Sequence, residues 1–249
     1  MAQNIYDTSD FFSEYSKLPR SMRGLDGAPE WPTLRMLVGD IRDKRVLDLA
    51  TGFGWVARWA VQEGDARSVH AIDISENMLK RAREMTAAQD IVEGKITYQR
   101  GNLEDLTLSE GEYDLVYCSL AFHYLPTDKL RRLLTEIYKS LSSGGKLVFS
   151  VEHPVMTAPS DAQWKWDNGQ VFWPLNQYWK EGLRITDWMT PGVRKYHRTI
   201  DTYLTLLIEA GLILTAFKEA WEGLDLETKL EETGEGHRPY FLLVSAKKP

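Results

Sequence analysis

Short apolar runs alternate with amphipathic segments through the middle of the chain. Runs rich in β-branched and aromatic residues predict strands at 46–49, 69–73, 96–100, 115–119 and 146–151, and two more close the chain at 212–217 and 240–246. Helical patterns lie between most of the first five. Because helices that alternate with strands are typical of crossover connections, the pattern predicts an α/β fold with a mainly parallel sheet.

Three helices are predicted from an N-cap residue followed by an apolar stripe. Ser75, Thr127 and Thr199 each precede residues that place apolar side chains on one helical face. The second helix is expected to end at Gly144–Gly145 and the third at Gly211, since glycine favours the left-handed conformation that ends many helices.

The order of these patterns predicts one domain over 1–249 with four segments. Residues 1–44 are mixed in pattern, 45–151 alternate regularly, 152–198 break the alternation as an insertion, and 199–249 add a helix and two strands. The acidic, glycine-containing tract at 222–236 is expected to be a solvated loop or short helix.

Composition and charge narrow the possible partners. The net charge is −6 and the 30 Lys and Arg residues are scattered, so the continuous basic stripe that nucleic acids require is not expected. The single cysteine, Cys118, excludes an intrachain disulfide and no C-x-x-C pair suggests zinc, so no metal is expected. No apolar run predicts a membrane span, and no signal peptide is recognisable at the N-terminus, so the expected location is the cytoplasm.

A strand, a glycine turn and a helix start follow one another in VLDLATGFGWVA, residues 46–57. Gly52 and Gly54 permit positive φ and a close approach of the backbone to a ligand. Asp73 ends the next predicted strand, where a carboxylate can accept both ribose hydroxyls of a nucleotide. The spacing Gly52-x-Gly54-x-x-Ala57 also fits a dinucleotide-binding enzyme, and a purely structural turn is a third interpretation.

Five stretches in this order carry a resemblance to a known family. They are LDLATGFG from Leu47, AIDISENMLKRARE from Ala71, GNLEDL from Gly101, YDLVYCSLAFHYL from Tyr113 and SSGGKLVFS from Ser142. The sequence resembles the class I S-adenosylmethionine-dependent methyltransferases, in particular a subgroup that acts on small molecules (type 11-like). The resemblance covers about residues 45–151 and continues more weakly to the C-terminus. It implies a Rossmann-like sheet of seven strands in the order 3-2-1-4-5-7-6, with the last strand antiparallel.

The resemblance also implies roles for individual residues. Asp48 would orient the methionine end of S-adenosylmethionine, Asp73 would bind the ribose hydroxyls and Ile74 would pack on the adenine. Asn102 and Leu103 would lie at the adenine edge. This chain has Ala50 where the family has its first glycine, and Asn102 where the family commonly has Asp. The donor-binding set expected on this basis is Asp48, Ala50, Gly52, Gly54, Asp73, Ile74, Met78, Asn102, Leu103 and Ser119.

Methyl transfer from a sulfonium needs alignment more than it needs a catalytic group, because the donor is already activated. A general base is needed only if the acceptor loses a proton. His123 and His153 follow the fourth and fifth predicted strands and are the candidate bases. Packing is the alternative role for His123, and a simple loop position is the alternative for His153. His197 is expected to line the pocket or to cap the helix that follows it.

The insertion and the N-terminal segment are the parts expected to cover the site. Five of the nine tryptophans lie in the insertion, where they would wall a pocket for an apolar or aromatic acceptor, form a small core of their own, or make a homodimer contact. In the N-terminal segment, Tyr15 would face the sulfonium and Arg20 the donor carboxylate. The alternative is an amphipathic helix that packs on the sheet.

The function expected from these observations is methyl transfer from S-adenosylmethionine to a small-molecule acceptor, with the acceptor atom left open between oxygen, nitrogen and carbon. A donor-binding regulatory protein without turnover is a second hypothesis. A nicotinamide-dependent oxidoreductase is a third, and Asp48 counts against it because dinucleotide enzymes usually have an apolar residue at that position.

Overall fold

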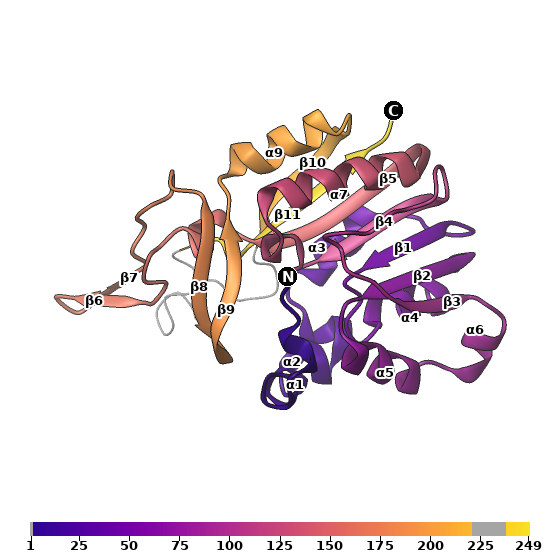
Figure 1. Ribbon diagram of the computed structural model, residues 1–249, viewed down its shortest axis with the longest axis horizontal. Coiled ribbons are helices and arrows are strands. Elements are labelled where there is room, and N and C mark those ends of the chain that lie inside the picture. The colour runs from indigo at the N-terminus through magenta and orange to yellow at the C-terminus, as the bar shows by residue number, and fades with distance from the viewer. Residues whose placement is uncertain (1, 221–237) are drawn as a thin grey trace.

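A seven-stranded sheet forms the centre of the computed structural model, which describes residues 2–220 and 238–249 (Figure 1). The strands lie in the order β10-β11-β5-β4-β1-β2-β3. Their bounds are β1 Arg45–Leu49, β2 Ser68–Asp73, β3 Ile96–Arg100, β4 Tyr113–Ser119, β5 Leu141–Glu152, β10 Ile213–Ala220 and β11 Phe241–Lys247. The order predicted from the resemblance is confirmed. The acidic tract at 222–236 lies outside the described residues.

The pairing directions also agree with the prediction. β1 pairs in parallel with both β2 and β4, β2 with β3, and β4 with β5. β11 is antiparallel to β5 on one side and to β10 on the other, so it alone runs against the sheet. The carboxyl ends of the parallel strands therefore meet at one edge, which is where ligands bind in open α/β sheets.

Helices cover both faces of this sheet, and each face has its own apolar core. On one face α3 (Trp31–Val38) and α4 (Trp55–Gln62) pack over residues such as Val46, while on the other α7 (Thr127–Ser140) and α9 (Ile200–Glu209) pack over residues such as Leu47. Two further helices, α5 (Glu76–Met85) and α6 (Ala88–Val92), connect β2 to β3. Successive side chains of a strand point to opposite faces. The buried residues of β1, 46–49, are therefore apolar on both faces apart from Asp48.

The predicted helix ends are confirmed in two cases and wrong in one. Ser75 caps α5 with a side-chain oxygen that accepts a hydrogen bond from the Met78 amide at 3.1 Å, and Thr199 is the N-cap of α9. Thr127, in contrast, is the first residue of α7, which ends at Ser140 rather than at the glycines. Those glycines lie within β5, at the register shift opposite residues 113–115, and Gly144 has the positive φ of 75° that such an irregularity requires.

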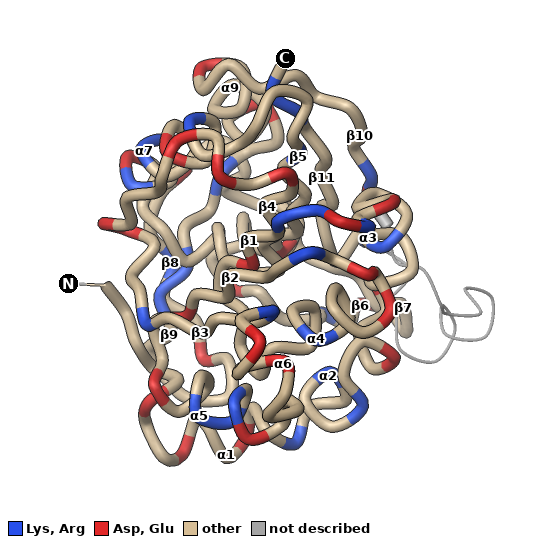
Figure 2. Tube along the Cα trace, turned by 90° about the vertical axis from the view of Figure 1, so that its right-hand side faces the viewer, with Lys and Arg blue, Asp and Glu red and all other residues tan. Residues whose placement is uncertain are grey.

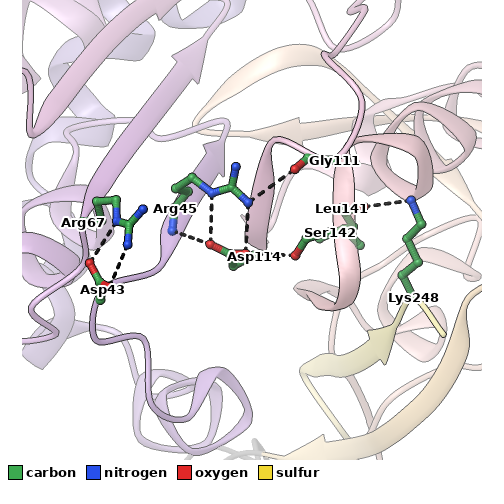
Figure 3. Close-up of polar contacts among 8 residues, drawn as sticks. All are labelled: Asp43, Arg45, Arg67, Gly111, Asp114, Leu141, Ser142 and Lys248. Atoms are coloured by element: carbon green, nitrogen blue, oxygen red, sulfur yellow. Dashed lines mark hydrogen bonds and ion pairs between the residues drawn. The ribbon is translucent and has the colours of Figure 1, made fainter.

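Polar contacts hold the amino ends of the strands together (Figure 3). Arg45 at the start of β1 donates to the Asp114 carboxylate on β4 from both its backbone N–H and its guanidinium, and Ser142 on β5 donates to the same carboxylate at 2.9 Å. Arg67 forms a bidentate pair with Asp43 just before β2. These contacts tie together the strands at the amino edge of the sheet.

Two segments lie at the carboxyl edge of the sheet (Figure 1). The N-terminal segment contains η1 (Ile5–Asp7), α1 (Ser9–Ser16), α2 (Pro19–Met22) and η2 (Gly24–Gly27). The insertion contains α8 (Pro154–Thr157) and two hairpins, β6 (Lys165–Asp167) with β7 (Gln170–Phe172), and β8 (Gly182–Trp188) with β9 (Thr190–His197).

Charge and apolar length can be followed along the described trace. Figure 2 shows basic and acidic residues interspersed along the trace, without a stripe of one sign. Within residues 2–220 and 238–249, no helix combines the length and the apolar character that a membrane crossing would need.

Candidate active site

A cavity of about 350 Å³ lies at the carboxyl ends of β1, β2 and β4. It is covered by the N-terminal segment and by the end of β8. Most of the predicted donor-binding residues line it: Asp48, Ala50, Gly52, Asp73, Ile74, Met78, Asn102, Leu103 and Ser119. Gly54 is not among the lining residues, so the fold brings together the whole predicted set except this glycine.

Asp48 is a buried carboxylate within β1, and it faces the cavity. Its Oδ2 accepts a hydrogen bond from the Thr51 hydroxyl at 2.5 Å. Burial raises the pKa of Asp48 to about 7, and the hydrogen bond from Thr51 only partly opposes that rise. A carboxylate that is held here against the cost of burial is suited to a cationic ligand group, which would favour its ionised form.

Asp73 joins the end of β2 to the glycine turn. Its Oδ2 accepts a hydrogen bond from the Gly52 amide at 2.9 Å, and its Oδ1 accepts one from the Ser75 amide at 2.9 Å. Burial raises the pKa of Asp73 to about 6, although both backbone hydrogen bonds favour the charged form. The carboxylate therefore has a defined orientation beside the turn, at the position where the sequence predicted a ribose contact.

The two glycines of the turn have different roles. A Cβ built on Gly52, where φ is 54°, would have no atom within 4 Å and would project into open space at the cavity wall. A Cβ on Gly54, where φ is 71°, would lie 2.4 Å from the Tyr98 hydroxyl. A side chain at position 52 would thus occupy space at the cavity wall, whereas a side chain at position 54 would collide with Tyr98 on β3.

Ala50 and Leu120 have left-handed backbones at the ends of β1 and β4. Their φ angles are 55° and 53°, although neither is glycine, and both line the cavity. Leu120 is held in this conformation by its amide, which donates to the Ser150 carbonyl at 2.9 Å. A non-glycine residue with this backbone costs roughly 1–2 kcal/mol, and such strain is concentrated at functional sites.

Asn102 follows β3 and forms a local turn at the cavity wall. Its Oδ1 accepts a hydrogen bond from the Glu104 amide at 3.0 Å, and its Nδ2 donates to Asp105 at 3.2 Å. The side chain that replaces the family's usual Asp therefore keeps the acceptor role of a carboxylate toward the backbone.

Tyr15 and Arg20 of the N-terminal segment both line the cavity. Arg20 donates to both carboxylate oxygens of Glu30, at 2.8 and 3.2 Å, and Glu30 is 1% exposed. The sequence predicted that Arg20 would face the donor carboxylate. Its guanidinium is already paired with the carboxylate of Glu30.

The three candidate histidines differ in where they lie. His123 lines the cavity, and burial lowers its pKa to about 4. His153 is not among the lining residues: its Nδ1 accepts from the Val155 amide at 3.1 Å and its Nε2 contacts Glu219 at 2.9 Å. His197 neither lines the cavity nor caps α9, because its ring nitrogens bind Thr157 and the carbonyl of residue 178.

The aromatic residues of the insertion divide into three groups. Trp188 lines the cavity and contacts Phe11 edge-on at 5.5 Å between centroids. Trp164 and Trp173 pack edge-on at 5.2 Å and form a small cluster that includes Arg238. Trp166 and Trp179 are 72% and 83% exposed. The pocket and small-core interpretations therefore each describe part of the insertion.

Several lining residues were not predicted from the sequence: Tyr6, Tyr117, Tyr124 and Glu152. Glu152 ends β5, so the rule that ligands bind at the carboxyl ends of parallel strands could have indicated it. Tyr124 directly follows His123 in the stretch that carried the resemblance. Nothing local in the sequence distinguishes Tyr6, because only the tertiary fold brings η1 over the sheet.

Comparison with known proteins supports the fold and identifies the family. Residues 46–145 match the model of a methyltransferase domain family. A crystal structure of an S-adenosylmethionine-dependent methyltransferase from Mesorhizobium loti is 40% identical, with a TM-score of 0.80 over 90% of this chain and 100% of that one. The chain belongs to the class I S-adenosylmethionine-dependent methyltransferases. The nicotinamide-dependent alternative is thereby set aside.

Two relatives extend the likeness of this methyltransferase beyond the central domain. An uncharacterised protein of Haemophilus influenzae is 31% identical over 98% of this chain and 97% of its own length. A ubiquinone/menaquinone biosynthesis C-methyltransferase of Hydrogenovibrio crunogenus is 30% identical over 72% of this chain and 69% of its own. The N-terminal segment and the insertion are thus part of a chain-length similarity.

The residues of the cavity fit the methyl donor of this family, S-adenosylmethionine. The open space beside Gly52 admits a ligand against the turn, and the buried Asp48 and Asp73 provide negative charge for a cationic nucleoside. When bound, the donor supplies a methyl group that is activated by a sulfonium.

Proposed function

We propose that this methyltransferase transfers the methyl group to a small-molecule acceptor by in-line displacement. The observation that carries the proposal is one cavity whose lining includes Tyr6, Tyr124, Glu152 and Trp188 besides the residues assigned to the donor. We assign the part of the cavity beside these four residues, the acceptor compartment, to the methyl acceptor. A covered compartment of this kind is suited to a small molecule and excludes water from the transfer.

The donor-binding roles in this proposal follow the geometry of the strand ends. Asp48 orients the methionine end, Asp73 holds the ribose hydroxyls, and Ile74 and Met78 pack against the adenine. Asn102 and Leu103 lie at the adenine edge. Ala50, Gly52 and Ser119 also line the cavity beside the donor, and Gly54 keeps the turn packed on β3.

The chain contributes mainly alignment, which can supply roughly 7–11 kcal/mol of the barrier. His123 remains a candidate group at the acceptor end because it lines the cavity. His153 is not carried into the proposal, because both of its ring nitrogens already have partners outside the cavity lining.

Calorimetric titration with S-adenosylmethionine and S-adenosylhomocysteine tests the donor site. Both compounds are expected to bind. If neither compound binds, the proposal is refuted. Incubation with labelled donor and a metabolite panel, followed by mass spectrometry, tests the transfer. A gain of one methyl group on a small molecule is expected, whereas tight donor binding with no product across the panel would favour a regulatory protein without turnover.

A further inference from the structure

The acceptor end of the cavity contains a buried ion pair at the end of β5. Lys195 on β9 contacts the Oε1 of Glu152 at 2.5 Å, and their side chains are 7% and 16% exposed. Burial by itself would raise the pKa of Glu152, but the ion pair with Lys195 lowers it. A charged carboxylate oxygen is therefore held at the wall of this compartment.

His123 lines the same cavity as Glu152 and contacts the backbone of that residue. Its Nδ1 accepts a hydrogen bond from the backbone N–H of Glu152 at 3.3 Å. The ring is neutral because burial lowers its pKa to about 4, so the single ring proton is on Nε2. In this tautomer Nε2 of His123 can donate a hydrogen bond to a ligand, but it cannot take up a proton.

Aromatic rings form the remaining walls. Tyr6 meets Tyr15 edge-on with centroids 5.4 Å apart, and Tyr124 packs on the His123 ring with centroids 4.4 Å apart. Trp188 closes the side toward the insertion, where Lys195 lies 5.0 Å from its ring centroid. Walls of this kind favour a flat, apolar ligand body with a few polar contacts.

The charges of the compartment exclude an anionic ligand. Among the described residues that line the cavity, Arg20 is the single Lys or Arg, and it already donates to Glu30 from Nη1 and Nη2. Lys195 is likewise engaged by Glu152. A carboxylate or phosphate on the acceptor would find no available countercharge there and would face the Glu152 carboxylate.

We infer that the compartment formed by Tyr6, Tyr124, Glu152 and Trp188 binds an uncharged aromatic acceptor through a ring hydroxyl, which donates to Glu152 and accepts from His123 Nε2. A hydroxyl is suited to this pair because it donates and accepts at one atom. This inference rests on the proposed function and specifies its acceptor.

Proton and electron movements balance in such a transfer. The acceptor oxygen forms a bond to the methyl carbon, the methyl–sulfur bond breaks, and its electron pair stays on sulfur. The hydroxyl proton passes to the Glu152 carboxylate and from there to solvent. The products are an aryl methyl ether and the neutral thioether S-adenosylhomocysteine.

Calorimetry on the full chain saturated with S-adenosylhomocysteine provides the test, with three probes of similar size. The probes are 4-methylphenol, 4-methylanisole, which has no hydroxyl, and 4-methylbenzoate, which is an anion. We expect 4-methylphenol to bind at least about tenfold more tightly than either of the others, because each lacks the donated hydrogen bond to a charged group. Equal or tighter binding of 4-methylbenzoate would overturn the inference.

A variant tests the role of Glu152 directly. Glu152→Gln should weaken 4-methylphenol binding by about tenfold and leave the affinity for S-adenosylhomocysteine unchanged within about twofold. If Glu152→Gln does not fold, the double variant Glu152→Gln/Lys195→Gln removes both charges of the pair and allows the same measurement. Unchanged 4-methylphenol affinity would overturn the inference. Failure of S-adenosylhomocysteine to bind the wild-type protein would instead refute the proposed function.

Discussion

The Asp7 carboxylate accepts a hydrogen bond from the Ser75 hydroxyl at 2.5 Å, although 68 residues separate them. The same carboxylate accepts one from the Asn77 amide at 3.1 Å, at the N-terminus of α5. On the other side of the cavity, Gln3 accepts a hydrogen bond from the backbone amide of Arg194 in β9 at 2.8 Å. Residues 3–7 therefore connect α5 to β9 of the insertion.

Asp7→Ala should weaken donor binding, because the N-terminal segment loses its attachment to α5. Hydrogen bonds to a charged group contribute roughly 1.5–3 kcal/mol, so the dissociation constant for S-adenosylhomocysteine should rise about tenfold or more. Calorimetry measures the affinity, and hydrogen exchange of residues 5–16 measures the opening of the segment. Asp10→Ala is the matched control, since Asp10 is exposed on α1 and is expected to leave both readouts unchanged.

Asp73→Ala should weaken donor binding by roughly 1.5–3 kcal/mol through loss of the ribose hydrogen bonds. Asp65→Ala removes one exposed carboxylate elsewhere and should leave the affinity unchanged. A dissociation constant that stays at the wild-type value would contradict the assignment of Asp73. Because Asp73 also orders the Gly52 turn, thermal unfolding of the variant should be measured alongside.

The two glycines of the turn should separate stability from donor affinity. Gly54→Ala should reduce the free energy of unfolding by about 2–4 kcal/mol, because it combines backbone strain with the close contact to Tyr98. Gly52→Ala should cost only about 1–2 kcal/mol from strain, and should weaken donor binding because its Cβ enters the cavity.

Denaturant unfolding and calorimetry of both glycine variants provide the measurements. Adding Tyr98→Phe to Gly54→Ala should restore part of the lost stability, since it removes the hydroxyl nearest the new methyl group. Equal losses of stability at the two positions would show that the contact with Tyr98 does not matter.

Donor affinity should fall as the pH is lowered from 8 to 5. Burial raises the pKa of Asp48 to about 7 and that of Asp73 to about 6 in the free protein, so both become protonated over this range. A cationic donor favours the ionised carboxylates, so each group weakens binding by up to about tenfold per pH unit below its pKa. Calorimetry in buffers of different ionisation enthalpy should show proton release on binding near pH 6.

The same two groups should have the opposite effect on the stability of the free protein. Their pKa values in the folded protein exceed 3.8, the ordinary value of an Asp carboxyl, so between about pH 4 and 7 the folded state binds more protons than the unfolded state. The free energy of unfolding should therefore decrease as the pH rises through this window. Asp48→Asn should reduce this slope and stabilise the free protein at pH 8 while weakening donor binding; a slope equal to that of the wild type would contradict the assignment.

Much of the donor site could be predicted from the sequence, because its residues occur next to recognisable strand and turn patterns. Asp48, Gly52 and Asp73 lie at fixed positions relative to strands whose apolar runs are unmistakable, and parallel strands bring their carboxyl ends to one edge. Helix ends were less certain: Thr127 was placed one position outside α7, and Gly144 was assigned to a helix end when it lies within β5. Local sequence is compatible with both placements, and pairing with β4 decides between them.

The sequence by itself determined the strands, the main helices between them and Asp73 at the carboxyl edge, because burial and periodicity act on neighbouring residues. The order of the strands and the role of Asp48 were implied by the resemblance to the family. The tertiary structure alone decided what covers that edge. Asp7 reaches Ser75, Lys195 reaches Glu152, and Trp188 but not Trp179 faces the cavity. These contacts join segments that are tens of residues apart and depend on packing geometry, which no local periodicity encodes.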